Sequence, residues 1–405
     1  MKDIGKVALG VVTGIGGFLD AGTIATCAQA GALFGFRLLW VVALGTACII
    51  FLSEMLGRLA AVSGHTLADA IRERFGIRYH AIPIVAEVFL DVMVLAAEIG
   101  GVAIALTLLT GVGFPWWSVP VAAGVWLLLW RGTFDRVEEG VALLGLVTLC
   151  FVVAAYKTDP GVRDILTGLV PSLPPHKPAQ YWFIAVSLLG SLLCPYVLNF
   201  YSAGAVEEGW TEKDLGANRL AAGLGMSLGG GLAAAVLIAA AMVLYPRGID
   251  GNTYEEMQLI VSQPLGHTGA TLFAVALGVT CFGAALQVSL NLSYTLAQAF
   301  GWNWSENLKP ADDARFAATY TVAIFLAAIV VAIGLDPLKV TMLAMALNAV
   351  VAPFLVLPLL ILMNDEDYLG PHTNGWLSNG VVAFCTILAF VLGVVAIPLQ
   401  ILGGN

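Results

Sequence analysis

Apolar residues fall in long runs along this chain, and most charged residues lie in the short stretches between those runs. A helix that crosses a bilayer needs about 20 mainly apolar residues, and runs of this order recur from one end of the chain to the other. We therefore predict eleven transmembrane helices. Their bounds in the sequence are 6–34, 37–62, 81–111, 116–131, 137–156, 180–204, 217–245, 267–300, 314–334, 338–363 and 378–402.

The composition agrees with an all-α polytopic membrane protein. Of the 405 residues, 59% are hydrophobic and 11% are charged, and the mean hydropathy is +0.90. A soluble domain carries about 25% charged residues. The net charge of −9 comes without a basic patch, so nucleic acid is excluded as a partner and the lipid bilayer is the expected surroundings. The six cysteines all lie in apolar runs, as small buried hydrophobes do.

The lysines and arginines predict the orientation. With a cytoplasmic N-terminus, twelve of the 18 fall on the inner side and six on the outer side, in agreement with the positive-inside rule. We expect a protein of the plasma (inner) membrane with its N-terminus in the cytoplasm and its C-terminus outside. The stretch HTLADAIRERFG, 65–76, predicts an inner amphipathic helix capped near Thr66 or His65, and GIDGNTYEEMQLIV, 248–261, predicts an outer surface helix.

The spans divide into two related halves and a tail. Spans one to five (1–156) and six to ten (157–363) form an inverted pair, because an odd number of spans reverses the second half, and 364–405 carries span eleven. Each half opens with a span interrupted near its middle, by LDAGT at 19–23 and by LLCPY at 192–196. Paired broken helices in inverted repeats indicate the midplane binding site of a transporter.

Asp20 is the strongest candidate for chemistry. A carboxylate near the bilayer centre costs a few kcal/mol or more, so a functional role is the first interpretation. The alternative is a structural N-cap for a half-helix that starts at Thr23 or Ile24. We favour ion coordination, because a merely structural span has no use for the break. Thr23 can add an oxygen ligand or bond back to its own helix.

The sixth span offers partners for that site. Pro195 lacks an N–H, so it frees backbone carbonyls near Ser191 and Leu192 that can face the same ion. Cys194 beside the break is either a thiol ligand or a core residue. The other polar side chains of this span are more simply explained by hydrogen bonds between helices; they are Tyr196, Asn199 and Tyr201.

Acidic residues also line one face of the third span. Glu87, Asp91 and Glu98 are four and seven residues apart, and an acidic stripe cannot face lipid. It lines a hydrated path, pairs with cations or holds protons, although Glu87 could be only a residue of the inner mouth. Glu54 and Arg58 predict a local ion pair. Weaker candidates for the path, or for polar contacts between helices, are Gln287, Ser289, Asn291, Ser293 and Asn348.

Several stretches resemble NRAMP divalent-metal transporters. The stretch GGFLDAGTIATCAQAGALFGFRLLWV resembles that family's first span, and SEMLGRLAAVSGHTLADAIRERFG resembles its second span and the following loop. AEIGGVAIALTLLTG, LTGLVPSLP and GSLLCPYVLNFYSA are similar to its third span, the loop before its sixth span and the sixth span itself. The resemblance covers essentially the whole chain. It implies a LeuT-like 5+5 inverted repeat with broken first and sixth spans plus an eleventh span, and divalent cation transport.

The sequence departs from the family pattern at the ion site. The family's Asp-Pro-Gly-Asn is Asp20-Ala21-Gly22-Thr23 here, and its Ala-x-x-Met-Pro-His is Ser191-Leu192-Leu193-Cys194-Pro195-Tyr196. An amide and a thioether are therefore replaced, and the family's histidine, implicated in proton movement, is Tyr196. A second family histidine is Tyr201, and of the family's Asp-x-x-Glu pair only Glu98 remains.

These departures favour hard cations and weak proton coupling. Tyrosine does not titrate near neutral pH, and hydroxyl ligands suit Mg2+ or Mn2+, as in the NRAMP-related magnesium transporter branch. We expect alternating-access transport of Mg2+ and Mn2+, weakly or not coupled to protons, with the divalent ion as substrate and with no cofactor and no obligatory protein partner. The expected metal-site residues are Asp20, Thr23, Ser191 and Cys194, and the expected ion-pathway residues are Ala21, Tyr196, Asp91 and Glu98.

Three alternatives stay open. A proton-coupled Fe2+/Mn2+ importer would use Cys194 in place of the thioether. An amino-acid or organic-solute symporter on the same fold would bind a carboxylate at half-helix ends, which Asp20 would repel. A membrane scaffold without transport is the third. An enzyme is not supported, because no nucleophile with its base and no phosphate loop is recognisable.

Overall fold

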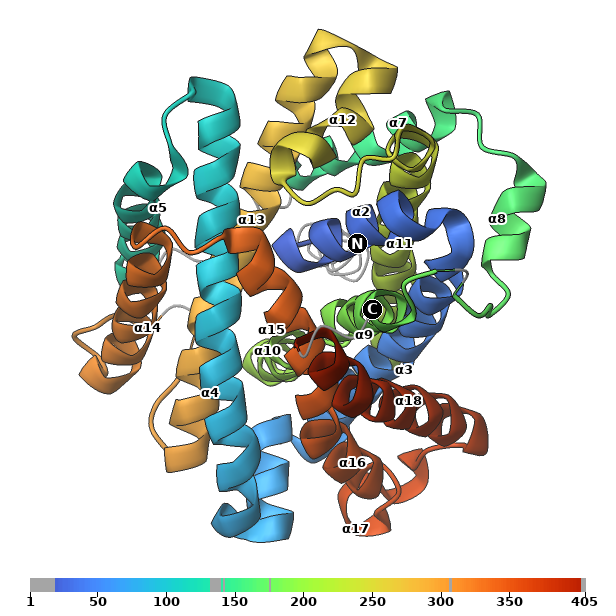
Figure 1. Ribbon diagram of the computed structural model, residues 1–405. Helices are drawn as coiled ribbons and strands as arrows, with labels where there is room; N and C mark the ends of the chain where they lie inside the picture. Colours follow the sequence, from blue (N-terminus) through green and yellow to red (C-terminus); the bar gives the residue numbers. More distant parts are fainter. Residues whose placement is uncertain (1–18, 132–139, 141–142, 175, 306–307, 402–405) are drawn as a thin grey trace.

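All regular secondary structure in the described residues is helical, and Figure 1 shows the helices packed into one bundle. Eight helical segments are long and apolar enough to cross a membrane, and the first, Ala21–Ser63, contains two predicted spans. Two shorter apolar helices, Phe114–Trp130 and Gly145–Lys157, correspond to the predicted fourth and fifth spans. The computed structural model describes residues 19–131, 140, 143–174, 176–305 and 308–401. The start of the first span and part of the fifth therefore lie outside the described residues.

Glycines end several helices of the first half. The backbone after α3 and after α4 turns left-handed at Gly64 (φ 70°) and Gly111 (φ 77°), which glycine adopts without a steric penalty. The helices of this half are α2 (Ala21–Phe34), η1 (Gly35–Leu38), α3 (Leu39–Ser63), α4 (Leu67–Thr110), α5 (Phe114–Trp130), η2 (Gly145–Thr148), α7 (Leu149–Lys157) and, in the connection to the second half, α8 (Val162–Gly168).

Helix α4 contains two predicted elements, the amphipathic stretch 65–76 and the third span. The backbone leaves the helical conformation at Gly76, where φ is 77° and ψ is 163°, so two helical segments meet there. Thr66 is the N-cap of the first segment and accepts a hydrogen bond from the backbone N–H of Asp69 at 3.1 Å. The predicted cap and the predicted end of the amphipathic helix are both observed.

Proline residues interrupt two spans of the second half. Helix α9 ends at Leu192 and α10 begins at Pro195, so the predicted break in the sixth span is observed. Pro353 only kinks the predicted tenth span, because Ala352 before it keeps helical backbone angles (φ −46°, ψ −40°). The helices are α9 (Pro178–Leu192), α10 (Pro195–Glu207), η3 (Glu212–Asp214), α11 (Leu215–Val243), η4 (Tyr245–Arg247), α12 (Tyr254–Leu265), α13 (His267–Phe300), α14 (Ala314–Ala332), α15 (Pro337–Val351), α16 (Pro353–Leu362), α17 (Glu366–Leu369), η5 (Gly370–His372) and α18 (Trp376–Ile401).

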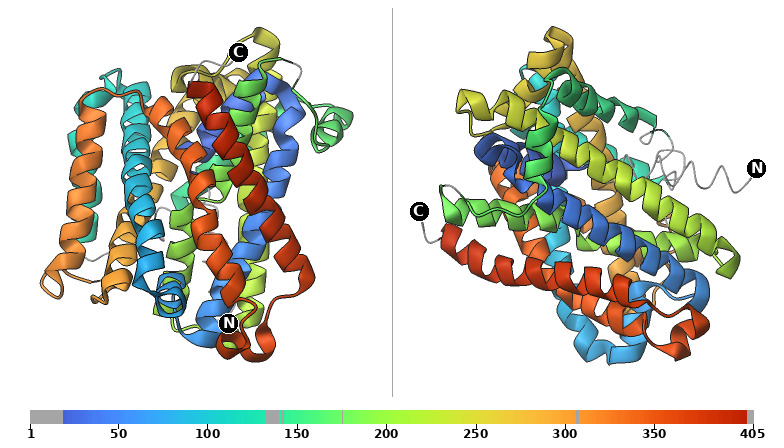
Figure 2. Two further views of the ribbon diagram at one scale, coloured as in Figure 1. Left: turned by 60° about the horizontal axis from the view of Figure 1, so that its bottom comes forward. Right: turned by 90° about the vertical axis from the view of Figure 1, so that its right-hand side faces the viewer.

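The short broken helices lie inside the bundle, and longer helices surround them. Figure 1 shows α2 near the centre, between α9, α11 and α15, and Figure 2 shows α18 along the outside of the bundle beside α15 and α16. Glycine permits the close packing of the central helices. A Cβ at Gly190 of α9 would lie 1.8 Å from the backbone oxygen of Met345 in α15.

Large apolar side chains cover the outside of the bundle. Phe89 of α4, Trp116 of α5 and Phe325 of α14 are 60%, 80% and 66% exposed. Soluble monomers rarely expose such side chains over a wide surface, and lipid tails are the surroundings in which they lie at no cost. The bundle is therefore built to sit in a membrane.

Candidate metal site

Asp20 caps the first described helix from a buried position. Its side chain is 2% exposed, and its Oδ1 accepts a hydrogen bond from the backbone N–H of Thr23 at 2.7 Å. The helix begins at Ala21, two or three residues earlier than predicted. The N-terminal end of a helix carries a partial positive charge that stabilises a carboxylate. Asp20 is thus an N-cap, as the structural alternative required, yet it also faces the break in the sixth span.

The break in the sixth span supplies three of the predicted residues. The Tyr196 hydroxyl donates a hydrogen bond to Asp20 Oδ2 at 3.2 Å, which joins α10 to the start of α2. Cys194 is the N-cap residue of α10 and is 1% exposed. Ser191 lies in the last turn of α9, where its hydroxyl donates to the Leu188 carbonyl at 2.9 Å and lies 3.3 Å from the hydroxyl of Thr26.

Backbone oxygens at this break suit a cation. Pro195 has no N–H, so the carbonyl of Ser191 four residues earlier cannot have its usual helical partner. The C-terminal end of α9 also carries a partial negative charge. The α9–α10 break therefore places hydroxyls and a freed carbonyl beside α2, whose first turn the Asp20 carboxylate caps.

A second carboxylate meets the start of α2. Glu98 of α4 is fully buried, and its Oε2 accepts a hydrogen bond from the Ala21 N–H at 3.2 Å. Its Oε1 is buried and has no hydrogen-bond partner. Among the ion pairs of the described residues, none includes Asp20 or Glu98. Two buried carboxyl groups without a basic partner form a site with high affinity for a cation or for protons.

Helix α15 adds sulfur and amide groups. The Asn348 Nδ2 donates a hydrogen bond to Cys194 Sγ at 2.9 Å and lies 3.8 Å from Met345 Sδ. Met345 packs against the start of α2, since a Cβ at Gly22 would lie 2.5 Å from its sulfur. The Cys194 sulfur thus accepts a hydrogen bond from the Asn348 amide, and α15 also places the Met345 thioether beside the site.

Most of the predicted site residues meet here, but Asp91 does not contact Asp20. Ala21, Glu98 and Tyr196 bond directly within the site, while Thr23 contributes its backbone N–H. Asp91 lies instead with Glu87, and both share the amide of Asn291. Glu87 is 1% exposed, so the interpretation of a mouth residue is wrong.

Three contributors were missed or ranked low in the sequence. Met345 and Cys281, whose sulfur packs against Gly101 of α4 near Ala21, look like ordinary core residues in apolar runs, and no sequence signal sets them apart. Asn348 was one weak candidate among several. Asn348 precedes the proline kink at Ala352–Pro353, and this helix breaker was the local signal that could have raised its rank.

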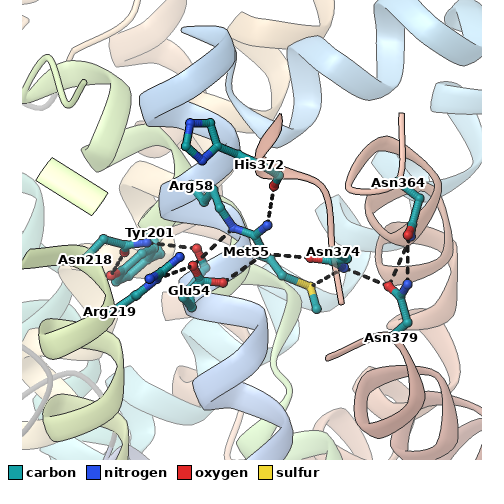
Figure 3. A network of polar contacts seen from close by, with 10 residues as sticks. All are labelled: Glu54, Met55, Arg58, Tyr201, Asn218, Arg219, Asn364, His372, Asn374 and Asn379. Carbon is teal, nitrogen blue, oxygen red and sulfur yellow. Dashed lines mark hydrogen bonds and ion pairs between the residues drawn. The ribbon is translucent and has the colours of Figure 1, made fainter. Parts of the chain in front are cut away.

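The predicted Glu54–Arg58 pair belongs to a larger polar network on one face of the bundle. The pair measures 3.0 Å, and Arg58 also donates to the His372 carbonyl and, at 2.6 Å, to Asn374 Oδ1. Figure 3 shows Asn218 and Arg219 of α11 approaching Glu54 from the other side. Polar contacts therefore join α3 both to α11 and to the segment before α18.

The same network holds the far part of α10. The Tyr201 hydroxyl donates to Asn218 Oδ1 at 2.8 Å, and the Asn218 amide donates to the Glu54 carbonyl at 2.8 Å (Figure 3). Tyr201 therefore bonds within this network and not to Asp20. The helix that carries Cys194 and Tyr196 at its start is tied at its other end to α3 and α11.

Several solved structures of transporters have the same fold as this chain. A manganese transporter of Eremococcus coleocola matches with a TM-score of 0.78 and 21% identity over 99% of this chain and 88% of that one. Mhp1, a nucleobase-cation-symport-1 family transporter, matches with a TM-score of 0.63 and 15% identity over 97% and 92%. MhsT in complex with L-phenylalanine gives 0.62 and 14% over 96% and 97%. The protein is thus an integral membrane protein with the LeuT fold, as the sequence resemblance implied.

A family model identifies the protein family to which the chain belongs. Residues 10–398 match the Nramp model, described as natural resistance-associated macrophage protein-like. The chain belongs to the Nramp family of divalent-metal transporters, and it is a transporter and not an enzyme. The predicted family and fold are confirmed.

Proposed function

We propose that this protein transports Mg2+ and Mn2+ by alternating access, weakly or not coupled to protons. One observation carries the proposal: the hydroxyl of Tyr196, and not a titratable imidazole, bonds the buried Asp20 carboxylate. A phenol with an ordinary pKa near 10 keeps its proton throughout the physiological range. The ion can therefore bind Asp20 without displacing a proton from this neighbour.

The donor atoms support a hard cation. Asp20 supplies a carboxylate, Thr23 and Ser191 supply hydroxyl and carbonyl oxygens, and Pro195 frees the Ser191 carbonyl. Mg2+ prefers oxygen ligands and keeps several waters. In this proposal Asp20 carries the main charge of the site. The remaining ligands come from Thr23, Ser191 and Cys194. The carboxyl group of Glu98 could carry the protons of a weak coupling.

The sulfur atoms favour a second candidate, a proton-coupled Fe2+/Mn2+ importer. Cys194 Sγ and Met345 Sδ both lie near the Asn348 amide, and soft ligands select later transition metals. The Eremococcus coleocola relative is a manganese transporter. A neutral thiol that accepts a hydrogen bond is a weaker ligand than a thiolate, so we place Mg2+ and Mn2+ first.

An organic-solute symporter is less well supported. The matching MhsT structure is a complex with L-phenylalanine. In this chain the start of α2 carries the buried carboxyl group of Asp20 and meets that of Glu98, and both would repel the carboxylate of an amino acid.

We also propose the orientation and the repeat division on sequence grounds. The face with the Arg58 network, where Arg74 also pairs with Asp365 at 3.1 Å, is cytoplasmic by the positive-inside rule. The N-terminus then lies inside and the C-terminus outside the plasma membrane. Residues 1–156 and 157–363 form the inverted repeats, with the α9–α10 break of the second matching the start of α2, and 364–405 form the tail.

Uptake by purified protein in liposomes tests the function. Wild type should take up Mg2+ and Mn2+, Asp20→Asn should take up neither, and Glu255→Gln, which removes an exposed carboxylate on α12, should match wild type. Retained uptake in Asp20→Asn would remove Asp20 from the site. Mn2+ uptake that excess Mg2+ does not inhibit would favour the Fe2+/Mn2+ importer, and in that case Cys194→Ala should lose Mn2+ transport.

A further inference from the structure

A second cluster of buried polar side chains lies between α4, α10 and α13. Glu87 Oε1 accepts hydrogen bonds from Asn199 Nδ2, from Asn291 Nδ2 at 3.0 Å and from Thr295 Oγ1 at 3.3 Å. Asp91 Oδ2 accepts from the same Asn291 nitrogen at 2.8 Å. All five side chains are at most 4% exposed. Three helices thus close around two carboxyl groups.

The two carboxyl groups have no basic partner. Among the ion pairs of the described residues, none includes Glu87 or Asp91. A buried, unpaired carboxylate costs several kcal/mol, and two that share one amide nitrogen also repel each other. The neutral hydrogen bonds from amides and a hydroxyl do not cancel this charge, so the cluster attracts a cation.

Two unpartnered oxygens point to a ligand. Asn199 Oδ1 and Asn291 Oδ1 are buried and have no hydrogen-bond partner, although the nitrogens of the same amide groups touch Glu87. A rotation of either amide brings its oxygen toward the carboxyl groups. The cluster then offers two carboxylates, two amide oxygens and one hydroxyl, all hard ligands of the kind that Mg2+ and Mn2+ take.

The cluster follows Asp20 along α10. Asn199 lies three residues, about one helical turn, after Tyr196, whose hydroxyl contacts Asp20. Two residues further, Tyr201 enters the polar network that ties α10 to α3 and α11 (Figure 3). The cluster therefore lies between the Asp20 site and the face that carries this network.

We propose that Glu87, Asp91, Asn199 and Asn291 form a second binding site for the transported divalent cation, one helical turn beyond the Asp20 site. This inference rests on the proposed function. An ion that leaves Asp20 toward the network face meets these oxygens before it meets solvent. A second site lowers the cost of release, because the ion exchanges one set of carboxylate ligands for another inside the bundle.

Anomalous diffraction from crystals soaked in Mn2+ tests the proposal, with calorimetry for stoichiometry. Wild type should bind two Mn2+ ions per chain, one at Asp20 and one between α4, α10 and α13. The double variant Glu87→Gln with Asp91→Asn should keep only the ion at Asp20. These changes preserve shape and remove buried charge, so the variant should fold. The control Glu73→Gln, an exposed acid on the same helix, should keep both ions.

The outcomes separate this proposal from the proposed function. A single Mn2+ in wild type, or two in the double variant, overturns the second site. A wild-type Mn2+ stoichiometry that Asp20→Asn leaves unchanged overturns the proposed function instead. Asn199→Ala is a milder check, because it removes one unpartnered oxygen and leaves both acids. It should weaken Mn2+ binding at the second site about tenfold or more without changing the Asp20 site, and unchanged binding contradicts the proposal.

Discussion

Replacing Tyr196 with histidine should make protonation of the new side chain compete with metal binding at the Asp20 site. In the structure the Tyr196 hydroxyl lies 3.2 Å from Asp20 Oδ2, and the other carboxylate oxygen accepts from the Thr23 N–H. An imidazole in the same place reaches the same carboxylate. Unlike the phenol, it titrates near neutral pH, with an ordinary pKa of about 6.5.

The size of the effect follows from charge and distance. An imidazolium beside Asp20 and a divalent ion on the same carboxylate would lie about 5 Å apart, and charges of +1 and +2 at that distance repel by about 7 kcal/mol at an effective dielectric constant of about 20. Even about 1.4 kcal/mol changes an equilibrium tenfold. The ion and the protonated imidazole therefore exclude each other, and uptake below the histidine's pKa should fall by up to about tenfold per pH unit.

Liposome uptake of Mg2+ at subsaturating concentration, measured from pH 5.5 to 8, checks this prediction. Wild type should vary little over that range, and Tyr196→His should lose uptake as the pH falls. Tyr201→His is the matched control, because that tyrosine hydrogen-bonds Asn218 and not Asp20. Identical pH profiles for wild type and Tyr196→His, or a steep profile in wild type, would refute the reasoning.

Three further predictions concern stability, each followed by thermal unfolding in detergent. Arg58→Met breaks a nearly buried pair and should lower the unfolding free energy by about 3 kcal/mol, whereas a midpoint unchanged from wild type would contradict this. Gly190→Ala should destabilise because its Cβ would collide with a backbone carbonyl of α15, while Gly204→Ala, with open space around it, should not. The guanidinium of Arg315 lowers the pKa of Asp313 to about 2, so their pair stabilises above the unfolded pKa near 4 and is lost as the pH falls through about 2. The midpoint difference between wild type and Asp313→Asn should accordingly be fully present at pH 5 and much smaller at pH 2, and a difference of the same size at both pH values would be inconsistent with this pair.

The fold could be predicted from the sequence because hydrophobic runs and helix breakers are local signals. Helix α9 ends at Leu192, three residues before Pro195, whose missing N–H leaves the Ser191 carbonyl without its helical partner. Pro353, preceded by an uninterrupted apolar run, only kinks the tenth span, and the backbone stays helical through Ala352. Gly76 is a local signal of the same kind, since it ends the amphipathic helix predicted at 65–76 with backbone angles (φ 77°, ψ 163°) that lie outside the helical range.

The sequence could predict a site residue only where burying that residue in a membrane costs free energy. Asp20 and Glu98 are expensive in a membrane, and they do meet at Ala21. Met345 costs nothing in an apolar helix, so only the packing of α15 against Gly22 shows that it lies at the site. The grouping of Glu87 and Asp91 with Asn199 and Asn291 depends on which faces of three helices meet, and no local pattern encodes that contact.

Simultaneous recording of Mg2+ entry and internal pH in the same liposomes tests the central claim most directly. With an inward Mg2+ gradient and a pH-sensitive dye inside, the account predicts Mg2+ uptake that depends on Asp20 and little or no acidification of the lumen. Acidification that rises in proportion to Mg2+ uptake, or Mn2+ uptake with no Mg2+ entry at all, would contradict it.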